Sequence, residues 1–93
     1  MAFAHITIHL NLPGTRSLKA KRSLLARLET AVRKLNYAFA EVGSQDLWQE
    51  SMVQLATVSS DGRLMESRLA LLEDQICQTA PDVMITRIEI ERF

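Results

Sequence analysis

The sequence contains few of the residues that build covalent, metal-bound or glycine-rich features. Among its 93 residues are one cysteine, three glycines, two prolines and only one tryptophan and one tyrosine. A single cysteine, Cys77, cannot form an internal disulfide, which fits a reducing compartment. No apolar run approaches the ~20 residues that a membrane-spanning helix needs, and the first residues lack a basic, apolar leader. We therefore expect a cytoplasmic protein with neither a membrane anchor nor a secretory signal.

A chain of this length predicts one domain, residues 1–93, with a single modest core. Hydrophobic residues make up 47% and charged residues 24% of the sequence, as in ordinary globular proteins. The formal net charge of zero hides a segregation of charge. Residues 16–34 hold seven cations and one acid, a net charge of +6, whereas the remainder holds four cations and ten acids, a net charge of −6. This asymmetry points to a negatively charged partner for the basic segment.

The first half of the chain predicts a strand followed by a helix. Residues 3–12 alternate between apolar and polar side chains, which is typical of a strand with one buried face. Pro13 and Gly14 end this strand. Ser17 is suited to capping the helix that follows, which runs to about Asn36. One apolar stripe of this helix is formed by Leu18, Leu25, Leu28, Val32 and Leu35.

The second half predicts strands over 37–43 and 51–59, a helix over 63–79 and a final strand after Pro81 and Asp82. The order strand, helix, strand, strand, helix, strand is typical of the ferredoxin-like fold. We therefore predict an α+β βαββαβ domain, a four-stranded antiparallel sheet with both helices on one face. We expect the first and third strands at the centre of the sheet, and the first and fourth strands not to be neighbours.

Several segments together resemble a known family. They are Ser17–Arg22 after the first strand, Ala40–Val42 with Gln45–Gln49 before the third strand, and the turn Val58–Asp61. In these segments the chain is similar to the YlxP-like family of small bacterial proteins of unknown function. The resemblance implies a ferredoxin-like fold. It also implies a link to the ribosome, because genes of this family are often found among those of translation initiation and ribosome maturation. It implies no catalytic residues.

The basic helix is the strongest functional signal in the sequence. Its first turn places cations around free backbone amides at the positive end of the helix dipole, which favours an anion such as phosphate. Cations further along the helix suit an RNA backbone bound with little sequence preference. The predicted nucleic-acid-binding residues are Arg16, Ser17, Lys19, Lys21, Arg22 and Arg27, with Ser17 shaping the helix end. The alternative is a solvated helix face whose cations pair with the protein's own acids.

Two aromatic residues indicate a second class of function, a homo-oligomeric protein-interaction module. Phe39 is expected on the uncovered face of the sheet, although that face lacks the aromatic signature of RNA-recognition modules. Trp48 lies in the polar connection 44–50. Its side chain either anchors a partner or folds back over the sheet edge, and the second interpretation is favoured. Phe39 and Trp48 are therefore the candidate partner-binding residues of a homodimer.

No set of residues predicts catalysis, a cofactor or a metal site. His5 and His9 face the same side of a strand, but at ~3.3 Å per residue they are about 13 Å apart, too far to share an ion. Cys77 has no CxxC partner and is expected to be an inert packing thiol. The sequence therefore predicts a non-enzymatic RNA- or ribosome-associated accessory protein, with ribosomal RNA or ribosomal subunits as partners.

Overall fold

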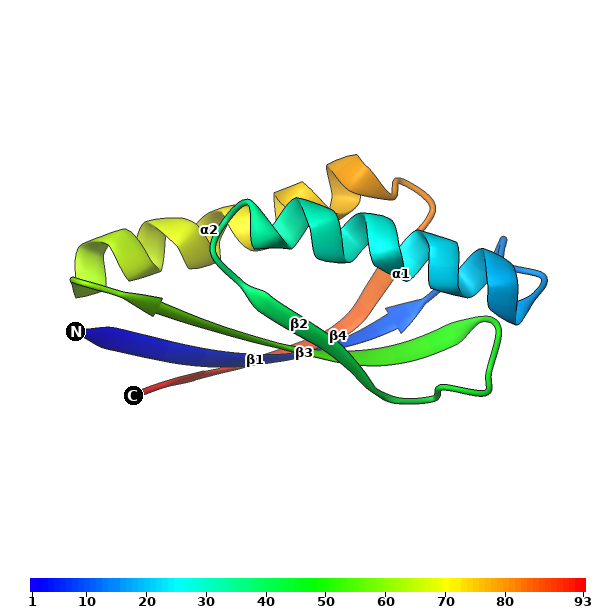
Figure 1. Ribbon diagram of the computed structural model, residues 1–93, viewed down its shortest axis with the longest axis horizontal. Coiled ribbons are helices and arrows are strands. Elements are labelled where there is room, and N and C mark those ends of the chain that lie inside the picture. The colour runs from blue at the N-terminus through cyan, green and yellow to red at the C-terminus, as the bar shows by residue number, and fades with distance from the viewer.

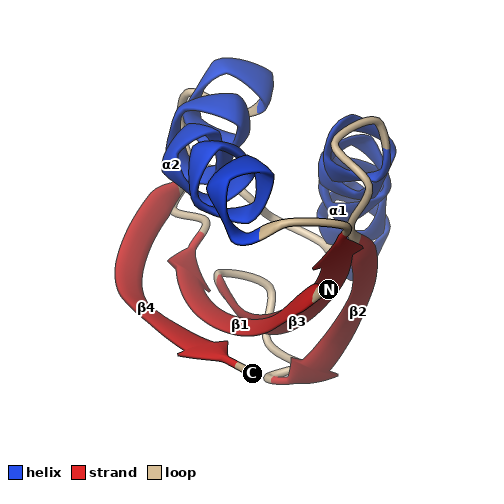
Figure 2. Ribbon diagram, turned by 90° about the vertical axis from the view of Figure 1, so that its left-hand side faces the viewer, coloured by secondary structure: helices blue, strands red, loops and turns tan.

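A computed structural model describes residues 1–93, and its elements follow the predicted order (Figure 1). The strands pair antiparallel in the order β2-β3-β1-β4, and both helices cover one face of the curved sheet (Figure 2). The predicted ferredoxin-like α+β fold is thus confirmed. The elements are β1 (Ala2–Asn11), α1 (Leu18–Arg33), β2 (Ala38–Gly43), β3 (Glu50–Ser59), α2 (Gly62–Thr79) and β4 (Met84–Arg92).

The strand neighbours differ from the prediction in one respect. β1 and β3 are central, as expected, but β1 also pairs with β4, from Ala4 opposite Arg92 to Asn11 opposite Met84. The reason is that each crossover helix is about 10 Å wide and spans two strand spacings of ~4.8 Å. The two strands that a helix connects are therefore separated by a strand of the other unit, so β4 lies on the far side of β1.

The core lies between the sheet and the helices, and the two amphipathic patterns meet there. Alternate residues of β1 are almost fully enclosed, among them Ile6 and Ile8, which have no exposed surface. Opposite them lies the α1 stripe that contains Leu28 and Val32, with Leu72 from α2. Burial of such side chains contributes about 1.5–3 kcal/mol each, which is the main force that holds the two layers together.

Both helix starts are fixed by side-chain caps. The Ser17 hydroxyl accepts a hydrogen bond from the Ala20 amide at 3.0 Å, as predicted. The Asp61 carboxylate accepts one from the Leu64 amide at 2.9 Å. Such caps satisfy amides that have no partner within the helix, each contributing about 1 kcal/mol. α1 therefore begins at the predicted position and carries its cations in a defined register.

The register of β2 overturns the expected position of Phe39. Residues directly opposite each other in a sheet share a face, and Phe39 pairs with Leu55 while Glu41 pairs with Val53. Because Leu55 and Val53 are buried against the helices, Phe39 and Glu41 also face the helices. Phe39 is half-buried and packs against the core. It is therefore not a partner-binding residue of the uncovered sheet face, and that prediction was wrong.

Candidate nucleic-acid interface

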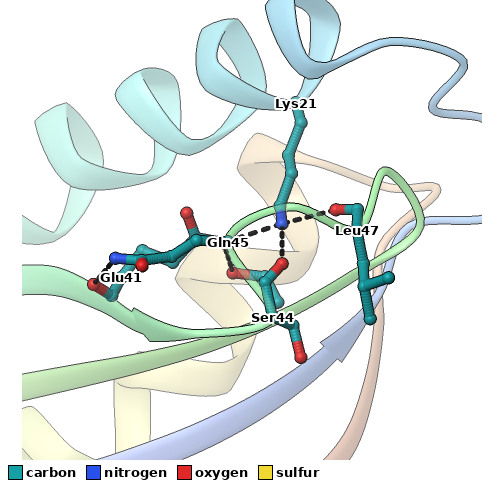
Figure 3. Close-up of polar contacts among 6 residues, drawn as sticks. Lys21, Glu41, Ser44, Gln45 and Leu47 are labelled. Carbon is teal, nitrogen blue, oxygen red and sulfur yellow. Dashed lines mark hydrogen bonds and ion pairs between the residues drawn. The ribbon is translucent and has the colours of Figure 1, made fainter.

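Lys21 is not available to a ligand, although it was predicted to bind phosphate. It lies four residues before Leu25 and thus on the buried side of α1, and its exposed fraction is 1%. Its ammonium group donates to the backbone oxygens of Ser44 at 2.5 Å and Leu47 at 2.6 Å, and pairs with Glu41 Oε2 at 2.8 Å (Figure 3). These three partners use all three donors of the ammonium group. The assignment of Lys21 to phosphate was wrong because the protein itself neutralises this charge.

The other predicted cations are placed differently. Arg16, Lys19, Arg22 and Arg27 are exposed, and none of them forms an ion pair with an acid of the protein. Lys34, at the end of α1, is likewise exposed and unpaired. By contrast, Arg33 Nη2 pairs with Glu29 Oε2 at 2.5 Å one helical turn away. Self-neutralisation therefore accounts for two of the seven cations of this segment, and five remain free.

A shallow groove between the two helices extends the basic surface. Arg27 and Lys34 of α1 line it together with the polar side chains of Ser23, Thr30, Gln75 and Thr79, and its volume is about 570 Å³. No acid is among its lining residues. The Ser23 hydroxyl and the Gln75 amide beside two cations offer hydrogen-bond donors to an anion. The Thr30 and Thr79 hydroxyls already donate to backbone carbonyls of their own helices. The groove thus has the chemistry to follow a phosphate backbone.

The β2–β3 connection does not fold back over the sheet edge as expected. Trp48 is 52% exposed and Leu47 is 50% exposed. The connection is nevertheless attached to the start of α1, because Lys21 holds the carbonyls of Ser44 and Leu47. The Leu12 amide also donates to the Gln49 carbonyl at 2.9 Å. Trp48 therefore projects into solvent beside the first turns of the basic helix.

The perturbed ionisable groups lie away from the basic surface. The Arg92 guanidinium donates two hydrogen bonds to Glu66, at 2.8 and 3.0 Å, and this bonding lowers the pKa of the Glu66 carboxyl. Burial raises the pKa of the Tyr37 phenol, an effect that the nearby Arg68 charge opposes. The Tyr37 hydroxyl is enclosed without a hydrogen-bond partner. These groups bear on stability and not on the candidate interface.

The remaining chemistry-bearing side chains are dispersed. No group of three histidine, cysteine or acidic side chains is placed to hold a metal ion. His9 approaches Glu89 at 3.9 Å on the uncovered sheet face. Cys77 is exposed on α2, so the expectation that it packs in the core was wrong. Neither helix has the length and apolar character needed to cross a membrane.

Comparison with known proteins decides the family. Residues 3–90 match the family described as "Protein of unknown function (DUF503)". The chain belongs to this family. The DUF503 chain is also 43% identical over 54 residues to the "Uncharacterized protein YlxP" of Bacillus subtilis (strain 168). That alignment covers 57% of this chain and 59% of the relative, so the chain spans less than two thirds of the relative's length in it. The YlxP-like resemblance is confirmed, and neither name states a function.

Solved structures similar to the DUF503 chain share its fold. SnoaB, a cofactor-independent oxygenase from Streptomyces nogalater, is 12% identical with a TM-score of 0.57, and the match covers 98% of this chain and 90% of SnoaB. A dimeric ferredoxin-like protein from an uncultured marine organism is 12% identical with a TM-score of 0.50, over 99% of this chain and 92% of that protein. At such identities the similarity concerns the fold, and the oxygenase activity is that of SnoaB. The prediction that this chain is not an enzyme stays a prediction.

One signal in the sequence identifies the buried lysine. Residues 21, 25, 28 and 32 are spaced by four, three and four, so Lys21 belongs to the same helical stripe as three core residues. A cation on that stripe indicates a buried ion pair. No local pattern indicates that its partner is Glu41, because that contact joins residues twenty positions apart.

Proposed function

We propose that this DUF503 protein is a non-enzymatic cytoplasmic accessory protein that binds RNA phosphates, with ribosomal RNA as the partner. The observation that carries the proposal is the set of exposed cations without internal ion pairs along α1 and the residues that flank it: Arg16, Lys19, Arg22, Arg27 and Lys34. A row of unpaired cations along one helix of an otherwise acidic protein favours a polyanionic partner. The family resemblance, with its ribosomal gene context, supports RNA as that polyanion.

The physical basis of this binding is the release of counterions from the nucleic acid. The logarithm of the binding constant falls linearly with the logarithm of the salt concentration. Each phosphate that a cation neutralises adds about 0.7 to the magnitude of this slope for single strands and about 0.9 for duplexes. If four cations each contact a phosphate of a single strand, a plot of the logarithm of the binding constant against the logarithm of the salt concentration should therefore have a slope near −3. The acid-free groove between α1 and α2 provides a path along which such contacts continue.

The test is charge reversal with a control of equal net charge. The variant Lys19→Glu/Arg22→Glu is compared with Arg63→Glu/Arg87→Glu, whose exposed cations lie on α2 and β4. Measured by the anisotropy of a labelled ribosomal RNA fragment, the α1 variant should bind at least tenfold more weakly with a shallower salt dependence. The control variant should stay within about threefold of the wild type. If RNA binding is weakened equally in both variants, the loss of affinity follows from the change in net charge alone, which would contradict a specific interface on α1.

A second function, self-association through the uncovered sheet face, is favoured by a separate observation. That face exposes three large apolar side chains at its β1, β2 and β3 strands: Phe3, Val42 and Val58, with exposed fractions of 38%, 41% and 48%. The small residues Ala38 and Ala56 lie opposite each other on the same face, so no large side chain at this pair blocks the approach of a second sheet. Exposed apolar surface on a sheet commonly marks an interface.

Sedimentation of concentrated protein tests this second function. Val58→Asp should disperse a dimer, whereas Leu71→Asp, which changes an apolar residue of α2 that is 54% exposed, should leave it intact. A substitution at Phe39 is unsuitable because that side chain packs against the core. A monomer at every accessible concentration of the wild type would contradict the dimer.

A further inference from the structure

The exposure of Trp48 is not explained by the packing of the fold. An indole is among the largest apolar side chains and is usually well covered, yet Trp48 is 52% exposed and its neighbour Leu47 is 50% exposed. Both belong to the β2–β3 connection, which lies at the same end of the molecule as the start of α1 (Figure 1). An apolar surface offered in this way favours contact with a ligand.

The connection that carries Trp48 is held in place on both sides of the indole. Before Trp48, the buried Lys21 ammonium fixes the carbonyls of Ser44 and Leu47 (Figure 3). After it, the Gln49 carbonyl accepts from the Leu12 amide at 2.9 Å. Because the backbone on either side is already ordered, a ligand that binds the indole does not have to order this segment, and binding loses less entropy.

The same attachments join the connection to the start of α1, which carries three free cations. Lys21, which holds Leu47, lies between Lys19 and Arg22 in the chain, and the side chain of Gln49 reaches the Thr15 carbonyl, next to Arg16. Arg16, Lys19 and Arg22 therefore lie at the start of α1, the part of the helix to which the segment that presents Trp48 is attached. A flat aromatic ring among cations is the combination with which proteins bind an unpaired base and its flanking phosphates.

The acids of the connection narrow the choice of ligand. Asp46 and Glu50 are exposed on either side of Trp48, so the three cations and two acids leave a local net charge of only +1. Such a site attracts phosphates only weakly through its charge, so a ligand that binds well must also contact the indole ring of Trp48. Duplex RNA keeps the faces of its bases stacked inside the helix, whereas a single strand offers them. The balance of charge and aromatic surface thus favours a single strand.

We propose that Trp48 stacks on an unpaired base of single-stranded RNA whose neighbouring phosphates contact Arg16, Lys19 and Arg22. This inference rests on the proposed RNA-binding function and narrows its ligand to single-stranded RNA. Stacking on one aromatic side chain commonly changes the affinity for a single strand by about fivefold to over a hundredfold.

The experiment uses Trp48 as its own probe, because it is the only tryptophan of the chain. A labelled ten-nucleotide single-stranded RNA of mixed sequence, and the duplex of the same sequence, are titrated while anisotropy and indole fluorescence are recorded. We expect the single strand to quench the fluorescence with the same Kd that anisotropy gives, and the duplex to leave it nearly unchanged. Trp48→Ala should weaken single-strand binding at least fivefold, whereas Trp48→Phe should keep most of the affinity.

Two further variants complete the design. Asp46→Asn/Glu50→Gln should strengthen binding, because it removes repulsion of the phosphates without touching the ring. Leu71→Ala removes an equally exposed apolar side chain from α2 and should leave the affinity unchanged.

The outcomes separate the two proposals. If no RNA changes the anisotropy, the proposed function fails and this inference fails with it. If RNA binds but the fluorescence is unchanged and Trp48→Ala binds as the wild type does, only the stacking proposal is overturned. Equal quenching by the duplex also overturns it. If the indole fluorescence changes with protein concentration in the absence of RNA, Trp48 contacts a second copy of the chain, and this result also overturns the proposal.

Discussion

Replacement of Lys21 by methionine gives the sharpest prediction for stability. Methionine keeps the length of the apolar part of the side chain but removes the ammonium group, so Glu41 and the carbonyls of Ser44 and Leu47 lose their donor. Removing one partner of a buried ion pair typically costs about 3–5 kcal/mol. The Glu41 side chain retains 20% exposure and a hydrogen bond of 2.6 Å from Ser51, which moderates the loss. We therefore expect a loss of about 3 kcal/mol.

Urea denaturation, followed by circular dichroism, measures this loss directly. A domain of this size should melt about 4–8 °C lower for each kcal/mol lost, so thermal melting gives a second reading. Arg33→Met is the matched control, because it removes an exposed cation paired with Glu29 on the same helix. Such an exposed pair contributes only about 0.3–0.5 kcal/mol.

A double variant tests the cause of the loss. Lys21→Met/Glu41→Leu removes both charges, and replacing a whole buried pair by apolar side chains is often neutral or stabilising. It should therefore be more stable than Lys21→Met alone. If Lys21→Met costs no more than Arg33→Met, the ammonium is solvated in solution, and the reasoning from burial is refuted.

Two other perturbations give smaller, independent checks. Tyr37→Phe should leave the free energy of unfolding unchanged or raise it by up to about 1 kcal/mol, because it removes a buried hydroxyl that has no partner; chemical denaturation measures this. Since burial raises the pKa of Tyr37, this group does not change the free energy of unfolding with pH below the ordinary tyrosine pKa, and it lowers that free energy as the pH rises from there through the folded value; ultraviolet titration of this single tyrosine locates the folded pKa. The lowered pKa of Glu66 has the opposite sign, so its contribution is present above the ordinary carboxyl pKa and is lost as the pH falls through the folded value. Carboxyl NMR titration should show the Glu66 pKa rising toward its ordinary value in Arg92→Met.

The fold was predictable because its local signals agree with one another. The alternation of residues 3–12 gives the buried face of β1, and the position of Ser17 gives the start of α1. Two amphipathic helices that each connect strands leave few ways to cover one sheet. The position of β4 beside β1 does not follow from local signals, since it depends on how far each crossover reaches.

The parts of the candidate site that were predicted wrongly depend on contacts between distant segments. In residues 37–43 the sequence pattern allows either alternate set of side chains to face the helices. Glu41 belongs to the same set as Phe39, and a carboxylate in that set predicts that the set faces solvent. The ammonium of Lys21 changes this outcome, because it allows a carboxylate to face the helices. The same contact removes Lys21 from the surface and attaches the connection that presents Trp48. The exposed cations, in contrast, follow from helical spacing alone.

The position of Glu41 on β2 also bears on aggregation. β2 is an edge strand, and its outer backbone groups are a template for another chain. Inward-pointing charged residues on an edge strand disfavour pairing with another chain, and Glu41 faces inward on β2. Lys21→Met/Glu41→Leu would lose this protection even if it folds more tightly. Its β2 edge would then be more open to pairing with another chain.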